Sequence, residues 1–125
     1  MPNLILVMCG GAVGSALRYQ IGRAALQRMG PEFPWGTLIV NLLGGLLMGI
    51  AVGIFTAEGS ADRPLWLLLA VGLLGGFTTF SAFSLDLFAM LERGQMMIAS
   101  LYAAASVAGS LLLLMLGFWL SRTAA

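Results

Sequence analysis

The sequence has no lysine and no histidine, and it has a single cysteine, Cys9. One thiol cannot form an intrachain disulfide, and without histidine it cannot complete a zinc site, so we expect Cys9 to be a small packing residue. The lack of histidine, and of any acid, base and nucleophile placed near one another, argues against an enzyme. A formal net charge of +1 is too small to indicate a nucleic acid partner.

Charge of either sign is scarce, because only 9% of the 125 residues are charged while 60% are hydrophobic. Soluble domains usually carry about 25% charged residues. Charge is missing altogether from four runs, residues 1–17, 33–57, 64–85 and 94–121. A spanning helix needs about 20 apolar residues, and a soluble helical bundle would need polar outer faces that these runs do not supply.

We therefore predict an all-α membrane protein that contacts the lipid bilayer along its whole length. Residues 1–125 are expected to form a single four-helix transmembrane domain, with spans of about 4–26, 35–57, 65–91 and 96–120. No basic segment precedes the first apolar run, so we expect that run to be a span and not a signal peptide.

Glycines recur at intervals of four within the predicted spans. Gly45, Gly49 and Gly53 follow one another in this way, and the pairs Gly10/Gly14 and Gly72/Gly76 share the spacing. Small residues four apart let helix backbones approach closely. The pattern indicates a tightly packed bundle and favours an oligomer.

The arginines give almost no preference for one orientation in the membrane. With four spans, Arg63 and Arg122 lie on the side of both termini, and Arg28 and Arg93 lie on the other side. Orientation follows the excess of basic residues in cytoplasmic loops, and here the count is nearly level. A chain of this kind can insert both ways, and two oppositely inserted copies can pair as an antiparallel dimer.

Two charged residues fall inside the predicted spans. Arg18 lies about two turns from the end of the first span; it either extends to the interface or faces water or a backbone carbonyl as a vestibule or structural residue. Asp86 in the third span likewise reaches the interface or lines a wet cavity.

The third span contains an unusual polar cluster, "GGFTTFSAFS", at residues 75–84. Paired glycines and β-branched threonines weaken a helix, so we predict a break near the middle of this span. Backbone groups freed in a membrane are tolerated only where they line a cavity or bind something, and transporters coordinate ions with such broken helices.

Neutral hydrogen-bond donors and aromatic rings accompany the cluster. Phe80 and Phe83 share a helix face, and ring edges are weakly positive, while Asn41 offers two N–H donors at mid-membrane depth. Further donors in the spans are Thr37, Tyr102, Ser106 and Ser110. Such a track suits a small anion that must bind and leave; packing against lipid or core is the alternative role of the two rings.

Three motifs together resemble the Fluc (CrcB) fluoride channels: "GGFTTFSAFS" in the third span, "GTLIVNLLGG" in the second and "GSALRY" in the first. The resemblance covers the whole chain. It implies a fluoride-selective channel of the bacterial inner membrane that exports cytoplasmic fluoride passively. It also implies an antiparallel, dual-topology homodimer with two pores and a structural sodium ion, Na+, at the dimer centre.

The resemblance also implies roles for individual residues. Phe80 and Phe83 match the phenylalanines that line the pores, Asn41 the pore asparagine, and Ser81 the serine between the rings. The carbonyls that hold sodium correspond to those of two residues, Gly75 and Thr78. The donors that fit the remaining polar track are Thr37, Tyr102, Ser106 and Ser110. Two positions depart from the family: Asp86 stands where many relatives have glutamate, and Ala82 where a hydroxyl residue can occur.

Two other classes of membrane protein are alternatives. A small multidrug-type exporter of dual topology couples protons through a glutamate in its first helix, whereas here the first span carries Arg18 and no acid. A non-transporting membrane scaffold would use the glycines for packing but would not need the donor track. An acid-coupled fluoride exchanger remains open, although no carboxylate stands at mid-membrane depth.

Overall fold

The computed structural model describes residues 2–57 and 63–124, and every regular element in these ranges is helical. In chain order the elements are α1 (Pro2–Met29), α2 (Trp35–Ala57), α3 (Pro64–Trp66), the π-helical η1 (Leu67–Leu74), α4 (Gly75–Phe77), α5 (Phe80–Glu92) and α6 (Met96–Ala124).

Four helical stretches are long and apolar enough to cross a membrane, in agreement with the predicted all-α class. These stretches are Pro2–Met29, Trp35–Phe55, Pro64–Glu92 and Met96–Thr123. The second helix has the predicted bounds, while the first and the last run further than expected. The third stretch combines α3, η1, α4 and α5.

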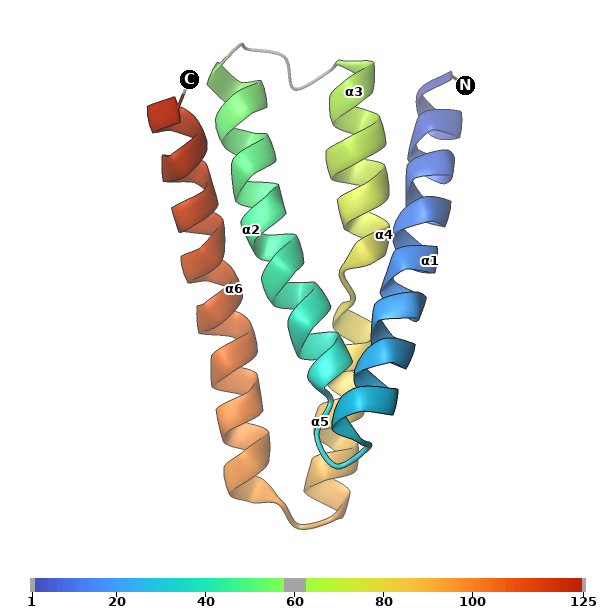
Figure 1. Ribbon diagram of the computed structural model, residues 1–125, viewed down its shortest axis with the longest axis vertical. Coiled ribbons are helices and arrows are strands. Elements are labelled where there is room, and N and C mark those ends of the chain that lie inside the picture. Colours follow the sequence, from blue (N-terminus) through green and yellow to red (C-terminus); the bar gives the residue numbers. More distant parts are fainter. Residues whose placement is uncertain (1, 58–62, 125) are drawn as a thin grey trace.

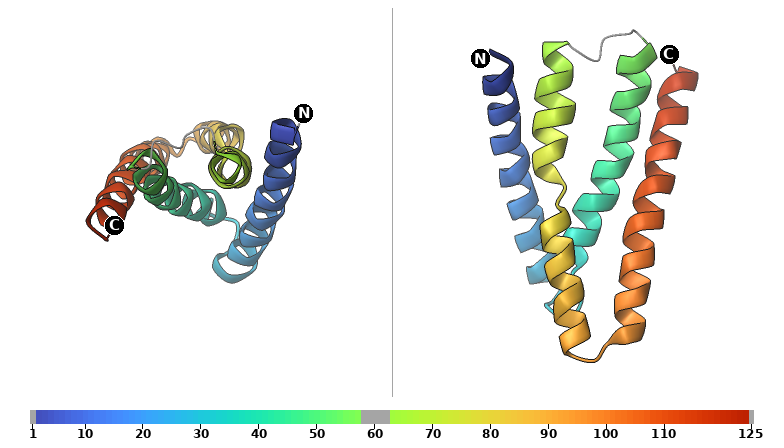
Figure 2. Two further views of the ribbon diagram at one scale, coloured as in Figure 1. Left: turned by 90° about the horizontal axis from the view of Figure 1, so that it is seen from above. Right: turned by 180° about the vertical axis from the view of Figure 1, so that it is seen from behind.

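The four stretches run up and down beside one another (Figure 1). The start of α1 and the end of α6 lie at the same end, as the even number of spans predicts. Helix α2 packs along α6, and α1 packs along η1 and α4. In the view from behind, α5 and the lower part of α6 approach each other towards their connection (Figure 2).

Two glycines at the opposite end allow the chain to reverse direction. Gly30 follows α1 with a φ of 81°, and Gly94 follows α5 with a φ of 74°. Left-handed glycine is a common helix C-terminus because it has no Cβ to clash. Pro31 then prevents α1 from continuing.

The predicted close packing of glycine ridges is confirmed, and it occurs within one chain. A Cβ at Gly45 or Gly49 would collide with backbone atoms of α6, at Ser110 and Leu114 respectively. A Cβ at Gly10 would meet the backbone of η1 in the same way. These contacts bring α2 against α6 and α1 against η1 more closely than any larger side chain would permit.

The third stretch is not continuous at residues 78 and 79. Helix α4 ends at Phe77, Thr78 has φ −89° and ψ 158°, and Thr79 has φ −149° and ψ 126°, so both threonines are extended. The hydroxyl of Thr79 accepts the N–H of Ala82 at 3.1 Å and so caps the start of α5. The side chain therefore favours a new helix start where the glycines and threonines weaken the old helix.

Candidate functional site

The extended segment is held by a side chain from α2. The Thr79 N–H donates to Asn41 Oδ1 at 3.0 Å, and Asn41 Nδ2 donates to the Thr79 carbonyl at 3.1 Å. In a continuous helix the Thr79 N–H would bond to the carbonyl of Gly75. We call this pair of hydrogen bonds the Asn41 clamp, since one carboxamide satisfies both backbone groups of one residue.

A second side chain reaches the same segment from α1. Arg18 is half-buried, and its Nε donates to the carbonyl of Gly76 at 3.3 Å. Of the two alternatives open for Arg18, the structure thus places it against a backbone carbonyl. The guanidinium occupies an acceptor that the end of α4 leaves without an intrahelical donor.

The carbonyls of Gly75 and Thr78, unlike those of Gly76 and Thr79, are not engaged by a side chain of the described residues. Within residues 2–57 and 63–124, no hydrogen bond reaches the carbonyl of Gly75 or of Thr78. Their usual donors, the N–H groups of Thr79 and Ala82, bond to Asn41 and to the Thr79 hydroxyl instead. Gly75 is exposed and Thr78 is half-buried. The segment therefore offers two neutral, hard oxygen ligands.

A groove with a volume of about 330 Å³ lies beside the segment, between α2, α5 and α6. Its lining includes these residues that the sequence singled out: Asn41, Thr78, Phe80, Phe83, Ser106 and Ser110. The two rings lie 5.7 Å apart between centroids. Phe83 is only 7% exposed, whereas Phe80 is 77% exposed, so the groove is open on the side of Phe80.

The donors in this groove are not equivalent. Ser110 donates its hydroxyl to the backbone carbonyl of Asn41 at 3.3 Å. The hydroxyl of Ser106 is buried and, among the described residues, has no partner. Asn41 has a second amide hydrogen beyond the one used in the clamp. Because buried polar atoms are nearly always satisfied, the Ser106 hydroxyl is a candidate donor to a ligand in the groove.

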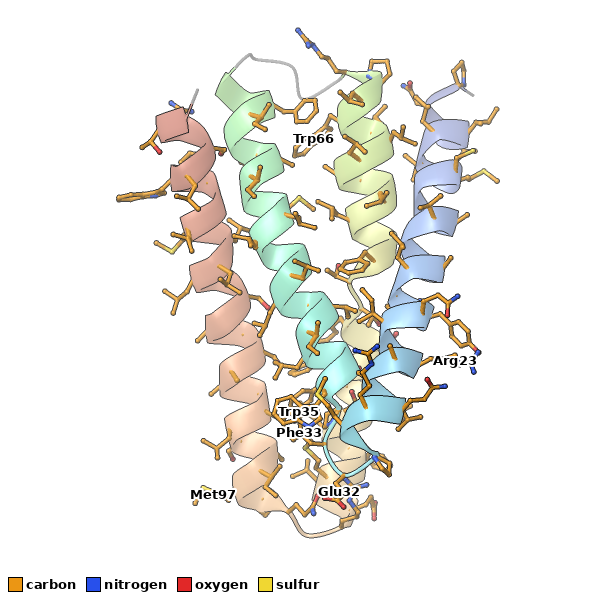
Figure 3. All side chains as sticks on the ribbon, in the orientation of Figure 1. Arg23, Glu32, Phe33, Trp35, Trp66 and Met97 are labelled. Carbon is orange, nitrogen blue, oxygen red and sulfur yellow. The ribbon has the colours of Figure 1, made fainter. Side chains whose placement is uncertain are left out.

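The other predicted track residues gather below the groove. Tyr102 is fully buried and donates to Asp86 Oδ2 at 3.0 Å, and Thr37 lies near its hydroxyl. The rings of Phe33 and Phe83 contact Tyr102 at centroid distances of 5.4 and 5.2 Å. Phe33 and Trp35 lie together at this lower end (Figure 3). The residues predicted to form one track therefore fall into two groups, one in the groove and one around Tyr102. The contact between the rings of Phe83 and Tyr102 links them.

Thr37 and Asp86 line hollows outside the groove. Both line a space of about 280 Å³ that is bordered by α1, by α2 and by the connection between them, residues 30–34. Thr37 also lines a space of about 250 Å³ that Arg18 borders from the other side. Asp86 thus accepts a hydrogen bond from Tyr102 and lines a hollow. This position agrees with the alternative that Asp86 lines a cavity.

Some placements were not visible in the sequence, and others differ from the expected track. Ser81 is exposed, its hydroxyl lies 3.3 Å from that of Thr79, and it is not one of the residues that line the groove. Thr79 was missed as a site residue. A threonine directly before an apolar helical run is a helix-cap signal that could have identified it.

Comparison with known proteins is consistent along the whole chain. Residues 5–118 match the family described as "CrcB-like protein, Camphor Resistance (CrcB)". Three relatives carry the name "Fluoride-specific ion channel FluC". The one from Sphingopyxis alaskensis is 49% identical over 112 residues, which are 90% of this chain and 89% of the relative. The one from Chelativorans is 49% identical over 123 residues, 98% of each chain. The one from Rhizobium etli (strain CIAT 652) is 46% identical over 125 residues, all of both chains.

Proposed function

Because the chain belongs to the CrcB-like family, we propose that this multi-pass membrane protein is a fluoride-selective ion channel. It exports fluoride passively from the cytoplasm across the bacterial inner membrane. The observation that carries the proposal is the groove between α2, α5 and α6. The rings of Phe80 and Phe83 line it together with Asn41 and with Ser106, whose buried hydroxyl has no partner among the described residues.

The chemistry of this groove suits a small, strongly hydrated anion. Its lining offers ring edges, a hydroxyl and an amide, and no lysine or arginine. Ring edges and neutral donors stabilise an anion weakly at several points. A fixed cation would bind it tightly and slow its release. Fluoride can therefore exchange its hydration shell for these contacts and still move on.

We further propose that two oppositely inserted copies form an antiparallel homodimer with two pores. The level arginine count supports both insertions. The groove is open, and Phe80, 77% exposed, lies on its open side. A second copy that covers this side would enclose the anion path and remove the exposed polar lining from lipid.

The same dimer is proposed to hold a structural sodium ion at its centre. The carbonyls of Gly75 and Thr78 fit a hard monovalent cation, because each lacks a hydrogen-bond partner among the described residues and carries no charge. Among those residues there is also no cluster of three or more Cys, His, Asp or Glu side chains. In this proposal, the interruption at residues 78 and 79 is the break that exposes the two carbonyls.

The alternatives account for fewer observations. Helix α1 contains Arg18 and no acid, so the coupling glutamate of a multidrug-type exporter is missing. A scaffold explains the glycine contacts but not the unpartnered hydroxyl of Ser106. For an acid-coupled exchanger, the candidate carboxylate in the third stretch is Asp86. It is the only acidic residue of Pro64–Glu92 apart from Glu92 at the end, and it accepts a hydrogen bond from Tyr102.

Growth of bacteria that lack their own fluoride exporter tests the proposed function in cells. Expression of this chain is expected to restore growth at a fluoride concentration that stops the parent strain, because passive efflux lowers cytoplasmic fluoride. Cells with an empty vector are the control. If the protein reaches the membrane in normal amount and growth is not restored, the proposed function is contradicted.

A further inference from the structure

We propose that Asn41 is a positioning residue for the cation site, in addition to its place in the anion groove. By holding both backbone groups of Thr79, its carboxamide sets the direction of the Thr78 carbonyl. The inference rests on the proposed function, because it concerns the sodium ion proposed there. It predicts that one side chain couples the sodium site to the fluoride groove.

The argument begins with the peptide unit between Thr78 and Thr79. The carbonyl of Thr78 and the N–H of Thr79 belong to one planar group, and in a trans peptide they point in opposite directions. No cis peptide occurs among the described residues. Asn41 Oδ1 accepts this N–H at 3.0 Å, so it directs the Thr78 carbonyl away from α2.

The second bond of the Asn41 clamp fixes the following peptide unit. Asn41 Nδ2 donates to the Thr79 carbonyl at 3.1 Å. Thr79 has the extended backbone of a β-strand residue, and its N–H and carbonyl meet one acceptor and one donor, as in a strand pair. Two consecutive peptide planes are thus held by a single side chain, and the soft dihedrals between them lose their freedom.

Arg18 hydrogen-bonds the carbonyl of Gly76, which lies in the sequence between the two proposed sodium ligands, Gly75 and Thr78. Its Nε donates to the Gly76 carbonyl at 3.3 Å. That oxygen is therefore engaged on the α1 side, while the carbonyls of Gly75 and Thr78 are left without partners among the described residues. Side chains from α1 and α2 thus engage the carbonyls of Gly76 and Thr79, which removes these two oxygens from those available to a cation.

Asn41 also borders the groove, so the two sites share a residue. Its backbone carbonyl accepts the Ser110 hydroxyl at 3.3 Å, and its side chain lines the groove beside Phe80 and Phe83. Any interaction that turns the carboxamide towards an anion must act on the Thr79 backbone as well. Coupling of this kind is reciprocal, so sodium binding is expected to stabilise the carboxamide orientation that the groove uses.

Sodium titration of the purified protein in detergent tests the inference. The readout is the sodium concentration that gives half of the maximal rise in apparent unfolding temperature, with N-methyl-D-glucamine replacing sodium. Asn41→Ala is expected to raise this concentration at least about tenfold, since it removes both clamp bonds. Ser100→Ala is the control, because it removes a side-chain hydrogen bond to a backbone carbonyl, from Ser100 to Met96 at 2.9 Å, outside the groove and the extended segment, and it should stay within about twofold of wild type.

Asn41→Ser serves if Asn41→Ala does not fold. Serine keeps a neutral polar group, but its short side chain cannot meet both backbone groups of Thr79 as the carboxamide does, so the half-maximal sodium concentration should again rise at least about tenfold. An unchanged value in the folded Asn41→Ala or Asn41→Ser protein overturns the inference. A wild-type protein whose unfolding temperature does not respond to sodium overturns the proposed sodium site as well. Fluoride efflux, measured separately, tests the proposed channel function independently of that site.

Discussion

Phe80→Ile is expected to reduce fluoride efflux from liposomes at least about tenfold while leaving the protein folded. Isoleucine keeps the apolar volume but lacks the positive ring edge that we assign to the anion. Phe80 is 77% exposed in one chain, so its replacement removes little packing within that chain. Efflux is followed with a fluoride electrode after a known amount of protein is reconstituted.

Phe88→Ile is the matched control for this substitution. Phe88 lies on the same helix and is 59% exposed, but it does not line the groove, so its efflux should equal that of wild type. Phe83→Ile should reduce efflux as well, with an added loss of stability, because Phe83 is 7% exposed and packs on Tyr102. Normal efflux in both groove variants would exclude the rings from the mechanism.

Gly49→Ala is expected to have the largest effect on folding, a loss of about 3 kcal/mol or more. The new Cβ would collide with the carbonyl and Cα of Leu114 in α6. These are backbone atoms, so relief requires α2 and α6 to separate along their shared contact. The loss is measured as a shift in the unfolding transition of the purified protein in mixed micelles.

Gly22→Ala provides the comparison for this prediction. A Cβ at Gly22 would have nothing within 4 Å, and alanine favours helix over glycine by about 1 kcal/mol. This variant should therefore be as stable as wild type or more stable. Equal stability of the Gly49 and Gly22 variants would mean that the glycine ridge does not set the distance between α2 and α6.

The spans could be predicted from the sequence because charge and proline mark their ends. Helix α2 begins after Pro34, and the predicted bounds are those observed. Helix α1 runs to Met29, past the predicted end, because Gln27 and Arg28 are good helix formers that composition alone treats as polar ends. The glycine contacts were predicted in kind, but the choice of partner helix depends on tertiary packing.

The site could be predicted only in part, since spacing along a helix does not specify neighbours. Thr37 and Asn41 share a helix face, yet they lie about 6 Å apart along the helix axis, and this places Thr37 beside the connection from α1, in a different hollow from Asn41. Ser106 and Ser110 share a face, but the Asn41 carbonyl accepts a hydrogen bond from Ser110 alone. The Ser106 hydroxyl has no partner among the described residues.

The pairing of Asn41 with Thr79 also lay beyond sequence reasoning. The residues are 38 positions apart, and a mid-membrane carboxamide serves a ligand or a backbone equally well. The family motifs identified Asn41 as a pore residue but gave no indication that its amide oxygen and one of its two N–H groups bond to the chain itself. That finding requires the coordinates of both helices.

Anion efflux from liposomes that contain the purified wild-type protein tests the central claim most directly. Fluoride and chloride electrodes record the two anions in parallel, with no pH gradient imposed. The account predicts rapid loss of fluoride and retention of chloride. Retention of fluoride by correctly folded protein, or equal loss of both anions, would contradict a fluoride-selective channel.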